Sequence, residues 1–277
     1  MALSFSSEVS IRMKRRHVIF LSLLGYVLLA GLYVGWSGSV SANDWRTASR
    51  EPAGLAPDPS TTREAVVQVY AARTVGWRGY IGVHTWIAVK PTDAAQFTVH
   101  EVIGYRLRRT GNVVVASSRH PDGYWFGAKP ELLSDLRGEG VDDVIERIGK
   151  AAQSYPYFDT YHVWPGPNSN TFVAWVLRSA PELRVDLPPT AIGKDYLGIV
   201  PVKKTPSGTG VQLNVFGLAG VMAGKEEGLE LNVLGLTFGV DPGSLGLKLP
   251  LIGKIGLRGQ KLPSRLQPNA SAPPQTL

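Results

Sequence analysis

YIGVHTWIAV, residues 80–89, is the clearest β-strand pattern in the chain and determines the fold prediction. Successive side chains of a strand point to opposite faces of a sheet. The odd-numbered positions, which include Ile87 and Val89, form an apolar face suited to a core. The even-numbered positions include His84 and Trp86, and this second face could line a site. We therefore predict a strand that separates a core from a functional surface.

The neighbouring segments complete an α+β pattern, in which strand-like runs are followed by helical ones. Strands are predicted at residues 65–73, 97–107 and 112–117, and helices at residues 131–136, 141–154 and 171–179. The predicted fold is therefore α+β, with an antiparallel sheet packed against a few helices.

The C-terminal part contains an internal repeat. GVQLNVFGL, residues 210–218, matches GLELNVLGL, residues 228–236. In each copy apolar and polar residues alternate, which is typical of an amphipathic strand, and residues 225–228 have the composition of a turn. Two copies are too few for a solenoid. We predict a β-hairpin or small meander appended to the main domain.

Composition excludes several kinds of site. The chain has 277 residues and no Cys, so it can form no disulfide, zinc–thiolate site or cysteine nucleophile. Its formal net charge of +7 is modest, and no basic stripe with interleaved aromatic residues is present, so nucleic acid is not an expected partner. No spacing of acidic or His residues supports a zinc or calcium site, and we expect neither a metal nor a cofactor.

Residues 18–36 (VIFLSLLGYVLLAGLYVGW) form an uncharged run that is long enough to span a membrane. Basic residues at positions 12 and 14–16 precede it, which predicts a cytoplasmic N-terminus. We therefore predict a single-pass signal anchor that contacts the lipids of the inner (cytoplasmic) membrane, with the domain on the periplasmic or extracellular side. A cleaved signal peptide ending near residues 40–42 is the alternative, and it also exports the domain.

These observations predict a division of the chain into six segments. They are a cytoplasmic N-terminus (1–17), the transmembrane anchor (18–36), a linker or arm (37–62), the main α+β domain (63–200), a β-hairpin or meander extension (201–259) and a disordered tail (260–277).

A candidate nucleophile lies where prolines give way to a helical pattern, at Asn168-Ser169-Asn170. Asn168 or Ser169 is expected to cap the helix, so that the Ser169 hydroxyl lies near the positive end of the helix dipole. A serine nucleophile needs a base within hydrogen-bond reach, and His84 is the best candidate. On the next predicted strand, His100 or Glu101 could orient that base.

Two other interpretations remain open. In the first, the domain is a non-catalytic module that binds an envelope lipid or peptide. Trp86, Trp125 and Trp164 would then form apolar walls, and Asn168 and Asn170 would be polar contacts. In the second, the domain is an envelope scaffold that pairs through exposed strand edges. The oligomeric state does not follow from the sequence.

Three motifs, taken in order, resemble the circularly permuted papain-like group, which includes the PPPDE peptidases and the lecithin:retinol acyltransferase-like proteins and is related to the NlpC-type amidases. They are GVHT (82–85), YWFG (124–127) and NSNTF (168–172). The resemblance implies a permuted papain-like fold with His84 as base and Ser169 in the nucleophile's position. It also implies His100 or Glu101 as orienter and a reaction at an amide or ester bond. Because Ser replaces the nucleophilic Cys, a papain-like module that has lost its chemistry is the alternative.

The exported sequence more closely resembles the bacterial domain-of-unknown-function family 3750. The stretches that carry this resemblance are WRTASREPAGLAP (45–57), the His84 strand, residues 165–172 and LPPTAIGKDY (187–196). This resemblance implies a family without an activity.

Overall fold

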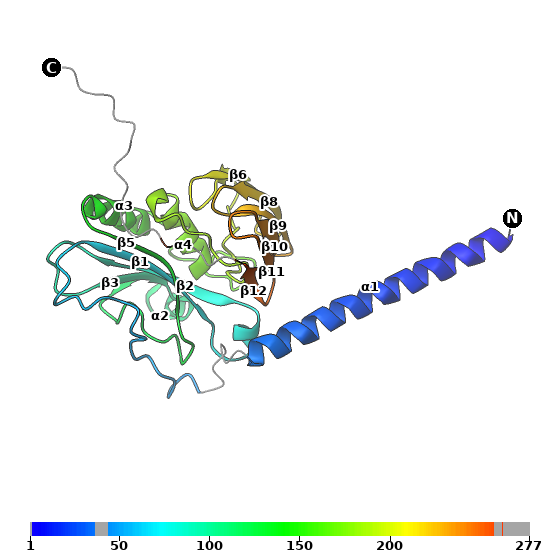
Figure 1. Ribbon diagram of the computed structural model, residues 1–277, viewed down its shortest axis with the longest axis horizontal. Coiled ribbons are helices and arrows are strands. Elements are labelled where there is room, and N and C mark those ends of the chain that lie inside the picture. Colours follow the sequence, from blue (N-terminus) through cyan, green and yellow to red (C-terminus); the bar gives the residue numbers. More distant parts are fainter. Residues whose placement is uncertain (1, 37–43, 258–261, 263–277) are drawn as a thin grey trace, which may run out of the picture.

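The computed structural model describes residues 2–36, 44–257 and 262. A long helix, α1 (Ala2–Trp36), projects from a folded part that contains a five-stranded and a seven-stranded antiparallel sheet (Figure 1). The predicted α+β class is confirmed. Much of the predicted tail, residues 260–277, lies outside the described residues.

Within α1, Lys14–Trp36 is long and apolar enough to cross a membrane. Only 11% of its most apolar window is buried, which excludes a core helix of the folded part. The predicted apolar segment is therefore present as one helix near the N-terminus, which is compatible with a membrane anchor or a signal sequence.

The first sheet forms the centre of the main domain and has the strand order β4-β3-β2-β1-β5. Its strands are β1 (Val66–Arg73), β2 (Val83–Lys90), β3 (Thr98–Val102), β4 (Val114–Ser117) and β5 (Glu131–Arg137). The helices of the main domain are α2 (Leu107–Thr110), α3 (Val141–Gln153) and α4 (Ser169–Leu177), with short 3-10 turns at Gly76–Tyr80, Gly104–Arg106 and Pro181–Leu183.

Both faces of the central strand β2 are buried, and each face belongs to a different core. Val83, Ile87 and Val89 pack into a large apolar cluster together with α3 and α4. Trp86 and Ala88 point the other way and belong to a smaller cluster on the opposite face of the sheet. The predicted division of β2 into two faces is confirmed, and it positions the site described below.

Residues 131–136 are a strand, so the predicted helix there is wrong. β5 pairs with β1 in antiparallel register, with an irregularity between Val69 and Tyr70. Leu133 and Leu136 enter the core, and the Ser134 hydroxyl donates to the Leu183 carbonyl at 2.9 Å. The open edge of β1 thus decided the conformation of a segment whose own pattern was ambiguous.

The C-terminal extension is larger than the predicted hairpin. It is a seven-stranded meander in the order β12-β11-β10-β9-β8-β7-β6, in which every neighbouring pair is antiparallel. Its strands are β6 (Val202–Lys204), β7 (Gly210–Val215), β8 (Ala219–Gly224), β9 (Gly228–Val233), β10 (Leu236–Asp241), β11 (Gly246–Leu249) and β12 (Gly253–Gly256). The two repeat copies begin with β7 and β9, which run in the same direction.

This sheet is amphipathic in the reverse of the usual sense, since its polar face is buried. Asn214, Glu230 and Lys248 are at most 2% exposed, whereas the alternating residues Leu229 and Leu247 are more than half exposed. Water-facing sheets normally bury the apolar side instead.

A chain of buried ion pairs joins the polar face to the main domain. The Lys248 ammonium donates to Asp186 and to Glu230, each at 2.5 Å. The Lys194 ammonium donates to the other oxygen of Glu230 at 2.5 Å and to Asp195 at 3.0 Å. Burial alone would lower the pKa of Lys194, but the charges of Asp195 and Glu230 raise it. Glu230 therefore holds two lysines, one from each side of the interface.

Replacing Lys248 by Ala should destabilise the protein by about 3 kcal/mol or more, because it leaves the buried Asp186 and Glu230 with too little positive charge. Urea unfolding of the full chain in detergent, followed by circular dichroism, measures the loss. Lys225→Ala is the matched control, since Lys225 is exposed in a turn of the same sheet. Equal unfolding midpoints for the two variants would show that the ion pairs contribute no net stability.

Candidate functional site

His84 and Glu101 meet on the face of the first sheet that is turned away from α3 and α4. The Nε2 atom of His84 lies 2.9 Å from Oε2 of Glu101, which comes from the neighbouring strand β3. The imidazole stacks on Trp125, with ring centroids 3.8 Å apart and planes 10° apart. It also stacks on Trp86 at 5.8 Å. The His84 side chain is therefore enclosed by aromatic rings and held by one carboxylate.

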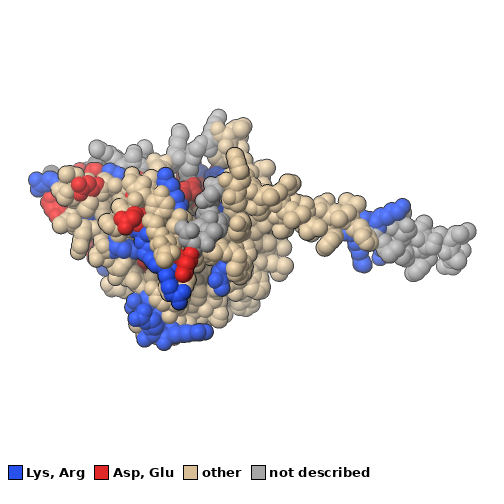
Figure 2. Space-filling model, turned by 90° about the horizontal axis from the view of Figure 1, so that it is seen from below, with Lys and Arg blue, Asp and Glu red and all other residues tan. Residues whose placement is uncertain are grey.

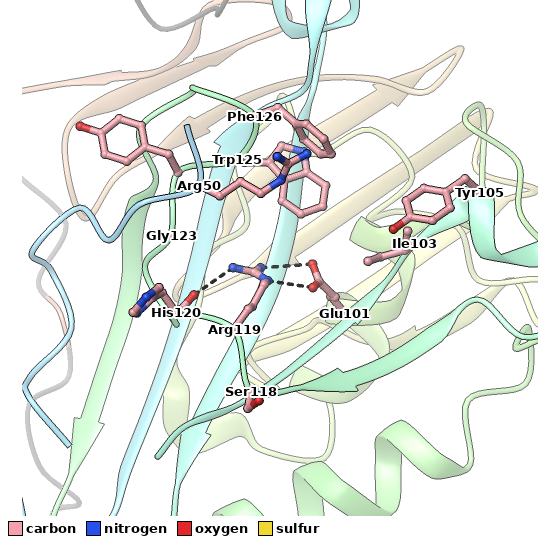
Figure 3. Close-up of a pocket in the computed structure, with 11 residues that line it drawn as sticks. Arg50, Glu101, Ile103, Tyr105, Ser118, Arg119, His120, Gly123, Trp125 and Phe126 are labelled. Carbon is pink, nitrogen blue, oxygen red and sulfur yellow. Dashed lines mark hydrogen bonds and ion pairs between the residues drawn. The ribbon is translucent and has the colours of Figure 1, made fainter. Parts of the chain in front are cut away.

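Arg119 completes the polar part of this arrangement. Its Nε and Nη2 donate to the two oxygens of Glu101 at 2.9 and 3.2 Å, and its Nη1 donates to the His120 carbonyl at 3.1 Å (Figure 3). The guanidinium also lies over the Trp86 ring, 4.7 Å from its centroid. Such a bidentate pair fixes both the position and the orientation of the carboxylate.

The electrostatics of the group favour a neutral His84 beside an ionised Glu101. Burial opposes ionisation of Glu101, but hydrogen bonds from His84 and Arg119 outweigh it and lower the pKa of Glu101 to about 2. Burial lowers the pKa of His84, and the hydrogen bond to Glu101 only partly offsets this effect. At neutral pH the His84 Nε2–H therefore donates to the carboxylate.

The N-terminal arm holds the loop that carries Trp125. Backbone amides of the loop donate to the arm, from Tyr124 to the Glu51 carbonyl at 2.9 Å and from Gly127 to the Ser49 carbonyl at 3.0 Å. In return, the amide of Leu55 donates to the buried carboxylate of Asp122 at 2.6 Å. The predicted arm thus lies along the domain and forms part of the site.

The tip of this loop is a strained turn. Trp125 and Ala128 exchange both backbone hydrogen bonds, and the two residues between them have positive φ, 48° at Phe126 and 86° at Gly127. Glycine adopts this conformation readily, but a bulky residue such as Phe does so at a cost of about 1–2 kcal/mol. The turn points the Phe126 ring toward Arg50, whose guanidinium lies 4.5 Å from the ring centroid.

These residues surround an open cavity of about 470 Å³. Its walls include Arg50, Glu101, Arg119, Trp125 and Phe126 (Figure 3). Glu101 offsets the charge of Arg119, whereas no carboxylate pairs with Arg50 among the residues that the structure describes. The cavity therefore combines aromatic walls with a net positive charge. Over the described ranges, no group of three or more His, Cys, Asp or Glu is placed to hold a metal ion.

Ser169 lies on the other side of the sheet, so the expected contact with His84 is not formed. Asn168 caps α4, with its side chain accepting from the amides of Asn170 and Thr171. The Thr85 hydroxyl donates to the Asn170 side chain at 2.9 Å, so Thr85 faces α4. His84 precedes Thr85 in the strand and therefore points to the opposite face. The sheet itself separates the proposed base from the proposed nucleophile.

The other candidate residues are also divided between locations. His100 pairs with Ile87 in the register of β2 and β3, and so lies on the face opposite Glu101. Trp86 is fully buried beneath Arg119, while Trp125 lines the cavity. Trp164 lies at the C-terminal sheet, where its Nε1 donates to the Leu234 carbonyl at 2.9 Å.

Arg119 and Arg50 are the functional candidates that the sequence analysis missed. Arg119 stands in an irregular loop between two strands, and Arg50 stands in the arm. Neither belongs to a periodic pattern or a spaced motif. The only available signal was indirect, since Arg50 lies within the WRTASREPAGLAP stretch and Arg119 lies a few residues before the YWFG motif.

The Glu101 interactions should make stability sensitive to acid. An acid whose pKa is lowered by folding stabilises the protein above its unfolded value of 4.5, and this stability is lost as the pH falls toward 2. As the pH falls from 6 to 3, the unfolding free energy of the wild-type protein should decrease by about 2 kcal/mol through Glu101 alone. In Glu101→Gln this part of the decrease should be absent. Urea titrations of the full chain at several pH values measure the slope.

His84 also lowers the unfolding free energy as the pH falls below its ordinary pKa of 6.5. The reason is that His84 in the unfolded chain binds a proton at a pH at which the buried ring stays neutral. Asp143→Asn, which removes a carboxylate at an exposed position of α3, is the matched control. An unchanged slope in Glu101→Gln would mean that the carboxylate is not held ionised in this way.

Comparison with known protein families gives a match to the central part of the chain. Residues 64–196 match the family described as "Protein of unknown function (DUF3750)". Neither the curated proteins nor the solved structures contain a match. The matched region runs from just before β1 to Tyr196 and so includes His84, Glu101, Arg119 and α4. Residues 64–196 are therefore similar to the DUF3750 family of proteins of unknown function, and no activity comes with that similarity.

Proposed function

We propose that the protein is a membrane-anchored binding module whose cavity takes a small anionic ligand with a flat apolar part. The observation that carries this proposal is the Arg50 guanidinium, which lies over Phe126 at the wall of the cavity without a carboxylate partner among the described residues. A carboxylate or phosphate group would supply that partner, and aromatic walls favour a planar apolar body.

The arrangement around His84 supports binding rather than catalysis. A general base needs a free nitrogen within reach of the group that it deprotonates. Glu101 holds Nε2 of His84, so Nδ1 is the ring nitrogen that could accept a proton. His84 is only 5% exposed and Trp125 covers one face of its ring, so a substrate has little access to that nitrogen. His84 and Glu101 then act as a rigid support that holds Arg119 and Trp125 at the cavity wall.

In this proposal, the domain keeps the arrangement of the permuted papain-like group that it resembles but no longer catalyses a reaction. The resemblance rests on the order of elements in this chain: a strand with His84, a strand with Glu101 and a helix that begins after Asn168. The separation of His84 from Ser169 by the sheet supports the non-catalytic form.

We place the domain outside the cytoplasm, in the periplasmic or extracellular space, with α1 as a single-pass anchor in the inner membrane. The basic residues at positions 12 and 14–16, before the apolar run, support this orientation. The ligand class is then an envelope lipid headgroup or peptide that carries an anionic group. No partner protein follows from the cavity.

Arg50→Gln should weaken binding of benzoate about tenfold, through loss of one charge-assisted interaction. Trp125 lines the cavity, so its fluorescence in the full chain in detergent reports binding. Benzoate and phenyl phosphate are the anionic probes, and benzylamine is the cationic counterpart. Arg63→Gln is the matched control, because the exposed Arg63 pairs with Asp93 away from the cavity.

The proposal is wrong if benzylamine binds as well as benzoate or if neither anion binds. It also fails if Arg50→Gln leaves the affinity for the anions unchanged.

A further inference from the structure

The outer face of the C-terminal sheet is a continuous apolar surface. The outward positions of β7 to β12 hold only Val, Leu, Ala, Phe, Ile or Gly. Six of the large residues there are between 39% and 57% exposed: Leu213, Val221, Leu229, Leu231, Phe238 and Leu247. A soluble domain rarely exposes so large an apolar face without a partner. We call this surface the outer sheet face.

One end of the same sheet carries apolar residues in its turns. Phe216, Leu234 and Leu251 connect successive hairpins at this end, with φ of 51°, 52° and 65°. These are positions where Gly or Asn is normally favoured, so a large apolar side chain costs backbone strain. The turn between β8 and β9, at the opposite end, carries Lys225 and Glu226 instead. The other turn at that end, between β10 and β11, carries the exposed Leu245. The charged turn residues Lys225 and Glu226 thus lie at the end of the sheet away from Phe216, Leu234 and Leu251.

The apolar end lies against the anchor helix. The Tyr26 hydroxyl donates to the Pro250 carbonyl, in the turn between β11 and β12, at 2.5 Å. At 1.5 Å per residue, Tyr26 lies about 15 Å along the helix from Trp36. Figure 1 shows α1 leaving the folded part beside β12, and in Figure 2 the surface nearest to α1 is largely uncharged. When α1 crosses a bilayer, the turn at Pro250 reaches the depth of the acyl chains.

We propose that the outer sheet face docks on the acyl chains of the bilayer in which α1 is anchored. The occupant is lipid, because the face is continuous with the spanning helix and its turns at that end are apolar. The binding cavity would then stand at a fixed distance from the membrane surface. This proposal rests on α1 being the anchor, but it is independent of the ligand of the cavity.

The absence of Cys allows a direct test with single-cysteine variants of the full chain. Leu231→Cys places a fluorescent label on the outer sheet face, Lys225→Cys places one in the charged turn between β8 and β9, and Leu28→Cys places one within α1. Each labelled protein is reconstituted into phosphatidylcholine–phosphatidylglycerol vesicles, and quenching by doxyl-labelled lipid is compared with quenching by iodide. Circular dichroism checks that each variant folds as the parent does.

Lipid should quench the Leu231→Cys label at least about threefold more than the Lys225→Cys label, as expected for a group buried at the acyl boundary. Lipid quenching at Leu28→Cys without quenching at Leu231→Cys overturns the docking but leaves the anchor intact. Lack of lipid quenching at all three positions shows that α1 does not insert, and this removes the basis of the docking and of the membrane anchor. Anion binding in the cavity is tested separately by the Arg50→Gln variant. Protection of the Leu231→Cys label from both quenchers, together with disulfide cross-linking between copies of the unlabelled Leu231→Cys protein under an added oxidant, overturns lipid docking in favour of a dimer.

Discussion

Glu230 lies between Lys194 and Lys248, and the orientation of the seven-stranded C-terminal sheet on the main domain depends on this buried contact. Each of the three side chains is at most 2% exposed, so none can be satisfied by water. Removing charges from water is costly unless they are paired with good geometry, and here each charge has an opposite partner. Asp186, Lys194 and Asp195 come from the main domain, so the sheet can bury its polar face only against that domain. Since a sheet has two faces, the apolar one must then point outward.

The main domain is organised by a second division, between the two faces of β2. One face packs on α3 and α4 and contains the Thr85–Asn170 contact, and the other contains His84, Trp86 and the cavity. The arm and the Trp125 loop cover the second face and hold Arg50 against the cavity. A site built in this way has rigid walls, and Arg50 has no carboxylate partner within the part of the chain that the structure describes, which is the basis of the anion-binding proposal. A Ser/His pair would need both groups on one face.

Several elements of the fold could be predicted because their signals are local. Alternation in residues 80–89 was sufficient for β2, and the apolar spacing of residues 141–154 was sufficient for α3. The prolines before Asn168 exclude an earlier helix start, which limited the cap to Asn168 or Ser169, and the structure has Asn168. β5 could not be predicted, because its conformation depends on the edge of β1, a distant segment. Arg119 was missed because its role depends on Glu101 and Trp86, which lie on other strands.

The sequence by itself determined a helix long and apolar enough to span a membrane, the α+β class and the presence of an amphipathic repeat, because length, apolarity and period are properties of contiguous residues. It could not determine which side of a strand faces which neighbour. In the repeat, polar and apolar residues alternate with a period of two whether the polar or the apolar side is buried. In β2, the same alternation does not indicate which side of the strand packs against α4. Only the packing of sheet on domain and of helix on sheet decided that the polar side of the repeat is inside and that His84 and Ser169 lie apart.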